Sequence, residues 1–401
     1  MRPFGALLPF GEAKRIVDEN ITLVTRVETV SLDDASGRVL ADDFVATLSA
    51  PPFDRAAMDG YAVKAEDTFE AGQRRPKILK MVGEVHAGEA LQQSVSAGEC
   101  IQIATGAMMP GGADAVVMVE DTEAGNGQVK VFKSVFPRAN VGREGEDIKQ
   151  GASVLRRGFV LDPGKVGVLS SQGITEVKVY EKPRVAILPT GEEVVEVGKK
   201  LKPGQVYDIN SHTIASVVKE NGGVPIRVGI SGDDIETLKA AVTEALKNDL
   251  VVLSGGSSVG ERDLLVNVIQ DLGEVLFHGI QVKPGKPTLF ALVQGKPLMG
   301  MPGYPTSCLM NTYLFLLPAL RKMAHLPPRR GQNLEARLGR RVSGSVGRRQ
   351  FLTVRIEGEE VIPAFKESGA ITSIAEADGY IEIAENIDLL EKDELVTVTL
   401  F

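Results

Sequence analysis

Cysteine and histidine are both scarce in this chain of 401 residues. Only two cysteines occur, Cys100 and Cys308, so a disulfide framework is excluded and we expect both thiols to be reduced and buried in cores. Four histidines are present, without the Cys/His spacing that binds structural zinc (His86, His212, His278 and His325). A structural zinc domain is therefore not predicted.

Long apolar runs and an excess of positive charge are also missing. The longest apolar stretch near a helix, Tyr313 to Leu320, is interrupted by Pro318 and is far shorter than the roughly 20 residues that span a bilayer. The first ten residues lack the pattern of a signal peptide, so we expect a cytoplasmic protein. A net charge of −8 argues against a general nucleic-acid binder, so anionic partners would need a local pocket.

The remaining composition is that of a globular protein. Hydrophobic residues make up 43% of the chain and charged residues 24%, and the length suggests two or three ordinary domains. The 43 glycines and 21 prolines occur in separate clusters, which is typical of many tight turns.

Residues 184–325 carry the clearest pattern, in which strands alternate with helical segments. This alternation predicts an α/β domain with a mostly parallel sheet and helices on both faces. We expect strands at 185–188, 224–230 and 250–253, and helices at 212–220, 235–247 and 263–272. Ligands bind such sheets beyond the carboxyl ends of the strands. The segments that follow the expected strands are polar and rich in turn residues (189–193, 231–234, 254–260 and 301–305).

The rest of the chain is mainly β in pattern. Residues 53–138 contain short β-branched segments broken by Gly-rich turns, which predicts a β-rich insertion. After Pro327, short strands at 351–356, 380–383 and 395–400 predict a small sheet or barrel. Residues 321–349 hold nine Lys or Arg against one acid, and this stretch is either a solvated surface or an anion-binding one.

The glycine-rich turn Ser254 to Gly260 follows a strand and precedes a helix, so its N–H groups could hold an anion. It has neither the Walker A ending nor the dinucleotide fingerprint. Residues 256–260 do match G-x-S-x-G, the nucleophile elbow of α/β-hydrolases. A serine hydrolase, with Ser258 as nucleophile and Asp271 and His325 as partners, is therefore one alternative.

Carboxylates cluster at the predicted strand ends. Oxygen ligands at one sheet edge could hold a hard cation such as Mg²⁺. The candidates are Glu192, Glu193, Asp233, Asp234 and Asp263. Capping is the alternative for two of them, because Asp233 with Glu236 fits a capping box and Asp263 can cap its own helix.

The segment Lys283-Pro284-Gly285-Lys286-Pro287 places two ammonium groups on one rigid turn. Such a turn suits an oxyanion or a phosphate group. The alternative is a surface turn whose lysines are simply solvated.

Taken in chain order, seven segments resemble the molybdopterin molybdenumtransferase (MoeA) family, whose eukaryotic relatives include the E domain of gephyrin. The match runs over nearly the whole chain. The segments are 51–62 with its Met-Asp-Gly-Tyr-Ala core, 105–107, 142–148, 190–193, 254–256, 283–287 and 302–305.

This resemblance implies an elongated protomer of four domains that forms a homodimer. The expected domains are a discontinuous dimerisation domain (1–50 with 140–180), a β-rich insertion (51–139), a molybdopterin-binding α/β domain (181–326) and a small β-barrel (327–401). The implied activity is the insertion of molybdate into the dithiolene of adenylylated molybdopterin, with Mg²⁺ and release of AMP. A non-catalytic pterin-binding scaffold of gephyrin type is the alternative.

The resemblance also assigns site residues, with Asp59 and Thr105 completing the site from the partner subunit. It implies catalytic roles for Asp59, Thr105, Glu193, Asp234 and Asp263, and metal ligation by Glu193, Asp233, Asp234 and Asp263. The implied substrate-binding residues are Asp147, Ser254, Gly255, Gly256, Ser258, Pro302 and Pro305. The implied molybdate-binding residues are Lys283, Lys286, Arg348 and Ser368.

Two positions depart from the commoner family pattern. Tyr304 stands where many bacterial members carry Asn, and Ser257-Ser258 replaces the commoner Val-Ser. Both departures resemble archaeal members, so tungstate stays beside molybdate as the expected oxyanion. With no adenylylating domain fused here, we expect a separate molybdopterin adenylyltransferase as a partner, and neither nucleic acid nor a membrane.

Overall fold

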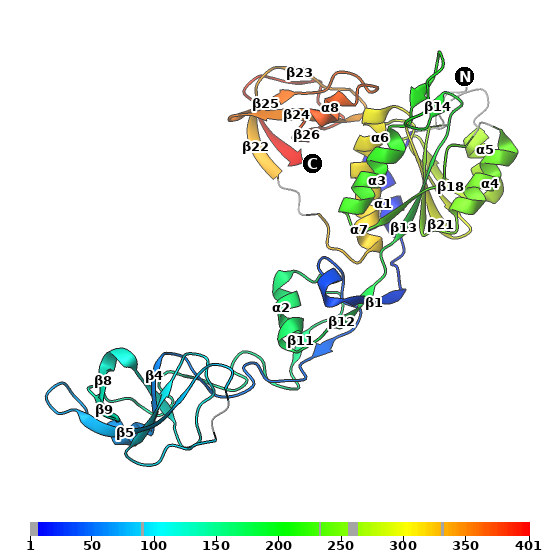
Figure 1. Ribbon diagram of the computed structural model, residues 1–401. Coiled ribbons are helices and arrows are strands. Elements are labelled where there is room, and N and C mark those ends of the chain that lie inside the picture. The colour runs from blue at the N-terminus through cyan, green and yellow to red at the C-terminus, as the bar shows by residue number, and fades with distance from the viewer. Residues whose placement is uncertain (1–6, 90–91, 232–233, 256–263, 330–332) are drawn as a thin grey trace. The chain divides into compact units, whose positions relative to one another are not determined.

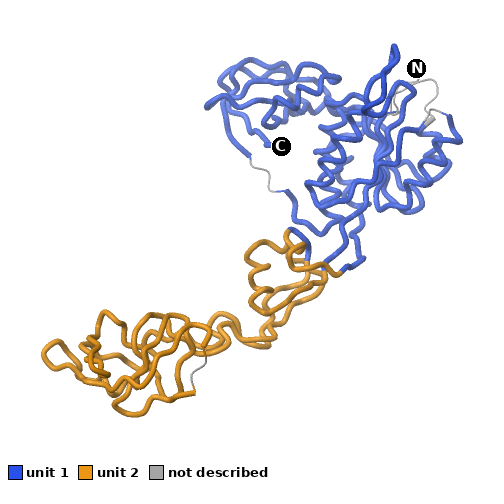
Figure 2. The backbone as a smooth tube through the Cα atoms, in the orientation of Figure 1, with its two compact units in different colours: residues 1–28, 37–39, 179–401 blue, residues 29–36, 40–178 orange. Residues whose placement is uncertain are grey.

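The chain folds into two compact units (Figure 2). Unit 1 comprises Met1–Glu28, Gly37–Val39 and Val179–Phe401, and unit 2 comprises Thr29–Ser36 and Leu40–Lys178. This computed structural model describes residues 7–89, 92–231, 234–255, 264–329 and 333–401.

Unit 1 contains a six-stranded sheet in which four neighbouring strands are parallel (Figure 1). The prediction of a mostly parallel sheet is confirmed. The pattern did not predict the antiparallel pair β18 (Gly273–His278) and β20 (Leu289–Val293). Nor did it predict the two-residue turn Gln294-Gly295, with φ of 52° and 76°, that joins β20 to β21 (Lys296–Met301). The strand order is β16 (Val224–Arg227), β13 (Arg184–Pro189), β17 (Leu250–Ser254), β21 (Lys296–Met301), β20 (Leu289–Val293) and β18 (Gly273–His278).

Helices cover both faces of this sheet, as predicted. Successive side chains of a strand point to opposite faces, so Val185 and Ile187 join one core while Ala186 and Leu188 join the other. All four are at most 1% exposed, which explains why the strand reads as an unbroken apolar run. The first face holds α1 (Phe10–Glu19), α3 (Asn210–Glu220), α6 (Pro305–Asn311) and α7 (Leu317–Met323), and the second holds α4 (Ile235–Ala245) and α5 (Leu264–Leu272).

A π-helical turn, Thr312–Leu316, connects α6 to α7. Pro318 follows it in the first turn of α7. Proline has no N–H for the helical ladder and its ring crowds the preceding turn, so the ladder widens just before it. The proline that interrupts the apolar run in the sequence therefore leaves the helix continuous but irregular.

The C-terminal part of unit 1 is a small β-barrel, as predicted. Its strands run β24, β25, β22, β28 and β26, and a further pairing of β24 with β26 closes the sheet. A short strand from the α/β part, β19 (Val282–Lys283), adds to β24 in parallel. The barrel strands are β22 (Asn333–Leu338), β24 (Arg349–Glu357), β25 (Glu360–Pro363), β26 (Gly379–Ile383) and β28 (Leu395–Leu400); β23 (Val342–Ser343), β27 (Leu389–Leu390) and α8 (Thr372–Ala375) lie between them in sequence.

Unit 2 is mainly β and contains the predicted β-rich segments. Its main sheet has the order β7 (Ala115–Met118), β4 (Gly60–Val63), β6 (Glu99–Ile103), β5 (Lys77–Val85), β9 (Gln128–Val131) and β8 (Thr122–Gly125). Short pairs join β2 (Phe44–Val45) to β11 (Ser153–Leu155) and β3 (Arg55–Ala56) to β10 (Val141–Gly142). Helix α2 (Pro163–Ser171) begins at its N-cap Asp162, whose side chain accepts from the N–H of Lys165.

The N-terminal residues divide between the units. Helix α1 belongs to unit 1, where the Phe10 ring lies 5.0 Å from the Phe351 ring. Strand β1 (Val27–Ser31) pairs with β12 (Glu176–Tyr180) where the chain passes from one unit to the other. A 3₁₀ turn, Leu32–Asp34, follows β1 and is capped by Ser31. The four domain boundaries implied by the resemblance stay a prediction.

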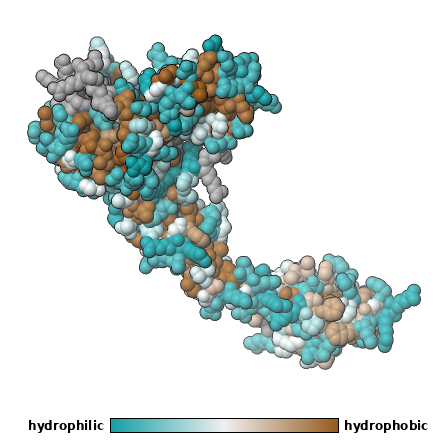
Figure 3. Space-filling view, turned by 180° about the vertical axis from the view of Figure 1, so that it is seen from behind, coloured by the Kyte–Doolittle hydropathy of each residue, from teal (hydrophilic) through white to brown (hydrophobic). Residues whose placement is uncertain are grey.

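Both cysteines are free and buried, and burial raises the pKa of the Cys100 thiol to about 12. The thiols are thus core residues, as expected from their small number. On the face drawn in Figure 3, hydrophobic residues are exposed among hydrophilic ones. Within the described part of the chain, no helix is long and apolar enough to cross a bilayer.

Candidate functional site

The segments that follow β13, β17 and β21 lie side by side at the carboxyl edge of the parallel strands. The N–H of Thr190 donates to the carbonyl of Ser254 over 2.9 Å, and the N–H of Gly255 donates to the carbonyl of Met301 over 3.3 Å. The sheet therefore brings together three segments that the sequence had marked as turn-rich and polar.

Glycine is required at position 255 by this close approach. Its φ is 95°, and a Cβ there would lie 2.4 Å from the carbonyl oxygen of Thr190. A Cβ on Gly303 would lie 3.6 Å from the Cα of Gly255. Gly255, which is partly exposed, thus lies against Gly303, and neither residue carries a side chain that would cover the backbone there.

Two buried polar atoms at this edge have no hydrogen-bond partner among the described residues. They are Oγ1 of Thr190, in a residue 4% exposed, and Oδ1 of Asn210, in a residue 8% exposed. The amide group of Asn210 is fixed because its Nδ2 donates to the carbonyl of Gly303 over 2.9 Å. Leaving such atoms unpaired is costly, so each retains the capacity for a further hydrogen bond.

The predicted acidic residues are placed differently from one another. The Glu193 carboxylate lies over Gly191, where a Cβ would be 2.7 Å from Oε2. Asp234 is the N-cap of α4 and accepts from the N–H of Thr237 over 2.9 Å. Hydrogen bonds from the side chain and the N–H of Thr237 lower the pKa of Asp234. The observed cap is therefore Asp234, whereas the capping box was expected at Asp233.

The predicted magnesium site stays a prediction. Asp233 and Asp263 lie outside the described residues, as do Gly256 and Ser258 of the glycine-rich turn. Among the residues that the structure describes, no group of three or more His, Cys, Asp or Glu side chains could hold a metal ion.

The turn from Lys283 to Pro287, here called the lysine turn, contacts both the barrel and helix α6. Lys283 lies opposite Gln350 in the parallel pair β19–β24. Gln350 is two residues after Arg348 in the sequence. A Cβ on Gly285 would lie 2.3 Å from Nδ2 of Asn311, which instead donates to the Gly285 carbonyl over 3.0 Å. The tight approach of the turn to α6 therefore depends on glycine at 285 and asparagine at 311.

The other two predicted oxyanion ligands lie in segments next to this turn. Arg348 immediately precedes β24, and the carbonyl of Ser368 accepts from the N–H of Thr306 in α6 over 3.1 Å. Neighbouring Arg349 instead forms salt bridges with Glu382 and Glu385. Part of the basic stretch thus stabilises the barrel, while β19, β24 and α6 link the segments that carry Lys283, Lys286, Arg348 and Ser368.

Asp59 and Thr105 are paired within unit 2. The N–H and the hydroxyl of Thr105 both donate to Oδ1 of Asp59, over 2.6 and 2.8 Å. These bonds, the backbone one first, lower the pKa of the exposed Asp59 carboxylate. Asp147 lies in a separate turn of this unit, where its N–H donates to the carbonyl of Ala50 over 3.1 Å.

Asp59 lines a pocket of about 140 Å³. The sequence pattern did not predict the other polar residues that line it. Glu84 and His86 both line it, with 3.4 Å between the carboxylate and Nε2. Their spacing in the sequence indicates that the two side chains lie together, because residues two apart on an extended segment face the same way.

The structure does not support the serine-hydrolase alternative. Asp271 forms a salt bridge with Lys239 at 3.8 Å. His325 contacts the Val24 carbonyl through Nε2 at 2.7 Å and stacks on Tyr180. Both expected triad partners are therefore held by other groups.

Comparison with known proteins agrees with this architecture. A model of the MoeA N-terminal region (domain I and II) matches residues 8–173, and one of the MoeA C-terminal region (domain IV) matches 335–401. Between them, residues 186–322 match a model described as "Probable molybdopterin binding domain".

Relatives match over nearly their whole length. A molybdopterin molybdenumtransferase of Haemophilus influenzae is 32% identical, over 96% of this chain and 98% of its own. Molybdopterin molybdenumtransferase 2 of Mycobacterium tuberculosis is 33% identical, over 94% and 95%.

Solved structures give the same result. A molybdopterin biosynthesis MoeA protein from Pyrococcus horikoshii has a TM-score of 0.87 at 43% identity, over 98% of this chain and 99% of that one. A second such structure has a TM-score of 0.84 at 34% identity, over 99% and 100%. These matches place the chain in molybdenum cofactor biosynthesis. The chain belongs to the MoeA family of molybdopterin molybdenumtransferases.

Proposed function

We propose that this protein inserts molybdate or tungstate into the dithiolene of adenylylated molybdopterin and releases AMP. The observation that carries the proposal is the edge formed by Thr190, Ser254-Gly255 and Gly303, with two buried polar atoms that the described residues leave unpaired. The relatives' name, molybdopterin molybdenumtransferase, supplies the substrate class.

The chemistry of this edge suits a pterin. Oδ1 of Asn210 can only accept hydrogen bonds, and the pterin ring carries N–H groups that donate. The hydroxyl of Thr190 can donate or accept. Because Gly255 and Gly303 have no side chains, a flat ring or a phosphate group can approach the backbone itself. We therefore assign pterin binding to Thr190, Asn210 and Ser254-Gly255, with Pro302 and Pro305 shaping the same edge.

The oxyanion is assigned to the segments around the lysine turn. Molybdate and tungstate are tetrahedral dianions, which require cationic donors. Lys283, Lys286 and Arg348 supply these charges, and Ser368 supplies a hydroxyl. The tight packing of Gly285 against Asn311 supports the role, because it holds the turn in one conformation before the substrate arrives.

Magnesium is assigned to carboxylates at the same edge. Glu193 lies over Gly191 just beyond β13, and carboxylate oxygens are the ligands that Mg²⁺ prefers. Asp233, Asp234 and Asp263 would complete the set. When bound, the ion would neutralise charge on the pyrophosphate of the adenylylated substrate.

The homodimer and the second enzyme are part of the proposal. Asp59 and Thr105 would complete the site from the partner subunit, with Asp147 contributing to substrate binding. The hydrogen bonds from Thr105 support a role for Asp59 as an ionised carboxylate, because they lower its pKa. A separate molybdopterin adenylyltransferase would supply the substrate.

The experiment is a turnover assay with adenylylated molybdopterin, Mg²⁺ and molybdate or tungstate. We expect AMP release that depends on Mg²⁺ and on the oxyanion, and loss of pterin binding in Thr190→Val. Lys14→Gln, which changes an exposed lysine of α1, is the control. Binding of the substrate without AMP release, at saturating concentrations of every component, would contradict the enzyme and favour the gephyrin-type scaffold.

A further inference from the structure

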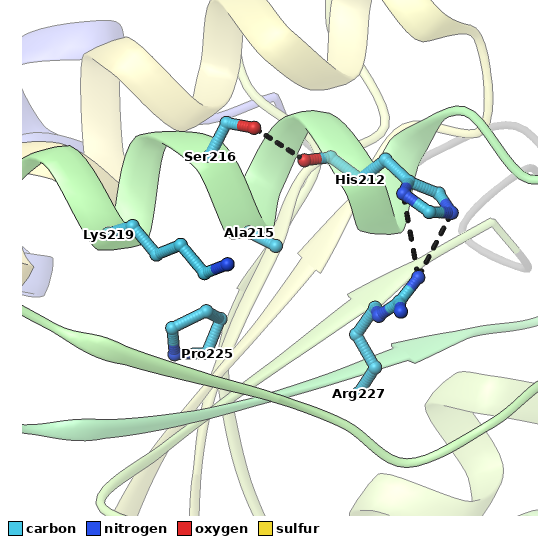
Figure 4. Close-up of a pocket in the computed structure, with 6 residues that line it drawn as sticks. All are labelled: His212, Ala215, Ser216, Lys219, Pro225 and Arg227. Atoms are coloured by element: carbon cyan, nitrogen blue, oxygen red, sulfur yellow. Dashed lines mark hydrogen bonds between the residues drawn. The ribbon is translucent and has the colours of Figure 1, made fainter.

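A basic pocket lies between helix α3 and the edge strand β16 of unit 1 (Figure 4). Its volume is about 350 Å³, which is within the range of small-molecule sites. None of its lining residues belongs to the proposed pterin, oxyanion or magnesium sites. They are His212, Ala215, Ser216, Lys219, Pro225 and Arg227.

The secondary structure explains why these side chains meet. On α3 the lining residues are spaced by three and four, so they share one face of the helix. The opposite face carries Ile214, Val217 and Val218, which are buried in the core and fix the orientation of the helix. Arg227 lies in β16, at the edge of the sheet, and Figure 4 shows its guanidinium turned toward His212.

Among the described residues that line the α3–β16 pocket itself, no carboxylate balances the positive charge. No acidic residue lines the pocket, and among the described residues Lys219 and Arg227 form no salt bridge. By contrast, Arg26 and Arg349 of the same unit each pair with two carboxylates. An unbalanced pair of cations in a concave site favours an anionic ligand.

His212 orients the guanidinium rather than neutralising it. Nη1 of Arg227 lies 3.0 Å from Nε2 of His212. A guanidinium can only donate, so the imidazole nitrogen that faces it accepts, and Arg227 keeps its charge and its other N–H donors. Ala215 of α3 and Pro225 of β16 also line the pocket and carry no polar side-chain group (Figure 4).

A second cavity continues from this pocket. It has a volume of about 450 Å³ and shares His212 and Arg227 with the pocket. Its other charged lining residues are Glu196, Lys199 and Asp208. A ligand larger than an inorganic ion therefore has space for an organic part beside the two cations.

We infer that the α3–β16 pocket binds a dianionic phosphate group, with Lys219 and Arg227 as its cationic donors and Ser216 at its side. Guanidinium and ammonium groups are the usual partners of phosphate oxygens. The inference does not rest on the proposed function, because its residues differ from those assigned to the pterin and to the oxyanion. The phosphate is either free or esterified to a small metabolite.

Calorimetric titration of the full-length protein with orthophosphate and with glycerol 3-phosphate tests this inference. We expect saturable binding, weakened at least about tenfold in Lys219→Gln/Arg227→Gln, because each substitution removes charge-assisted hydrogen bonds. Lys14→Gln should bind like the wild type. Tighter binding of the ester identifies a phosphorylated metabolite as the source, and equal binding identifies free phosphate.

Two results would overturn the inference. One is wild-type affinity in the double variant, since the phosphate would then bind elsewhere. The other is the absence of saturable binding of both probes to the wild type at low ionic strength, where such contacts are strongest. Circular dichroism and the melting temperature confirm that the double variant is folded, and its oxyanion-dependent AMP release should remain at the wild-type rate.

Discussion

At the scale of single residues, the candidate site depends on one glycine and on two buried polar side chains. Gly255 combines a φ of 95° with a carbonyl oxygen 2.4 Å from its missing Cβ. Thr190 and Asn210 carry buried atoms that the described residues leave unpaired. Each of these features follows from the close approach of loops that are far apart in the sequence.

We predict that Gly255→Ala abolishes pterin binding and destabilises the protein. Gly198 is a matched control, because its φ is also 95° but nothing lies within 4 Å of its Cβ position. Both variants should lose about 1–2 kcal/mol from the left-handed backbone conformation. Only Gly255→Ala should also lose the pterin, as measured by fluorescence titration. Equal pterin affinity in the two variants would show that the close approach at 255 has no part in binding.

Asp249 should make stability depend on pH. Burial raises its pKa, but hydrogen bonds from the Arg26 guanidinium and from the N–H of Arg184 outweigh that effect and hold the pKa below its usual value. A lowered folded pKa means that this stabilisation is present above the unfolded value of about 3.9 and is lost as the pH falls through the folded value.

We therefore expect Asp249→Asn to destabilise unit 1 by about 1–2 kcal/mol at pH 7, allowing for the partial exposure of Arg26. The difference from wild type should shrink below about pH 4 and vanish in stronger acid. Thermal unfolding across this pH range measures it. Asp271→Asn, which breaks an exposed pair at 3.8 Å, should change stability by no more than about 0.5 kcal/mol. A pH-independent effect of Asp249→Asn would show that packing, and not charge, is responsible.

At the scale of elements, the lysine turn is positioned by a helix and a barrel strand together. Strand β19 pairs with β24, while Asn311 of α6 bonds to the carbonyl of Gly285 and to Thr288. The sequence predicted the turn and its charges, but it held no signal for β19 or for the fully buried Asn311. Such partners are set by tertiary packing, so no local sequence pattern predicts them.

We predict that Asn311→Ala weakens oxyanion binding although every lysine remains. Loss of a buried amide with two partners should cost about 2–3 kcal/mol of stability and release the turn from α6. Molybdate calorimetry should then show an affinity reduced about tenfold. Thr353→Val, which alters a buried hydroxyl of β24 without a partner among the described residues, is the control and should bind normally. Unchanged affinity in Asn311→Ala would remove the positioning role.

At the scale of the whole molecule, the proposed homodimer makes a distinctive prediction. Asp59→Ala and Lys283→Ala should each be inactive, because each removes one of the two contributions to a shared site. Subunits mixed after reversible dissociation form mixed dimers in half of the cases, and each mixed dimer has one intact site. Activity should then recover to about a quarter of wild type. Size-exclusion chromatography confirms dimer formation, and no recovery from exchanged subunits would place both residues in a site built from one chain.

The sequence by itself determined the family, the mostly parallel sheet, the β-rich insertion and the C-terminal barrel. It could do so because strand periodicity, unbroken apolar runs and the order of short motifs along the chain can be read from the sequence directly. Tertiary structure alone decided that Gly255 lies against Thr190, that Asn311 holds the lysine turn, that Asp234 caps α4, and that Lys219 and Arg227 share one pocket. These contacts join residues that tertiary packing brings together, and a local sequence pattern does not determine the distances between them.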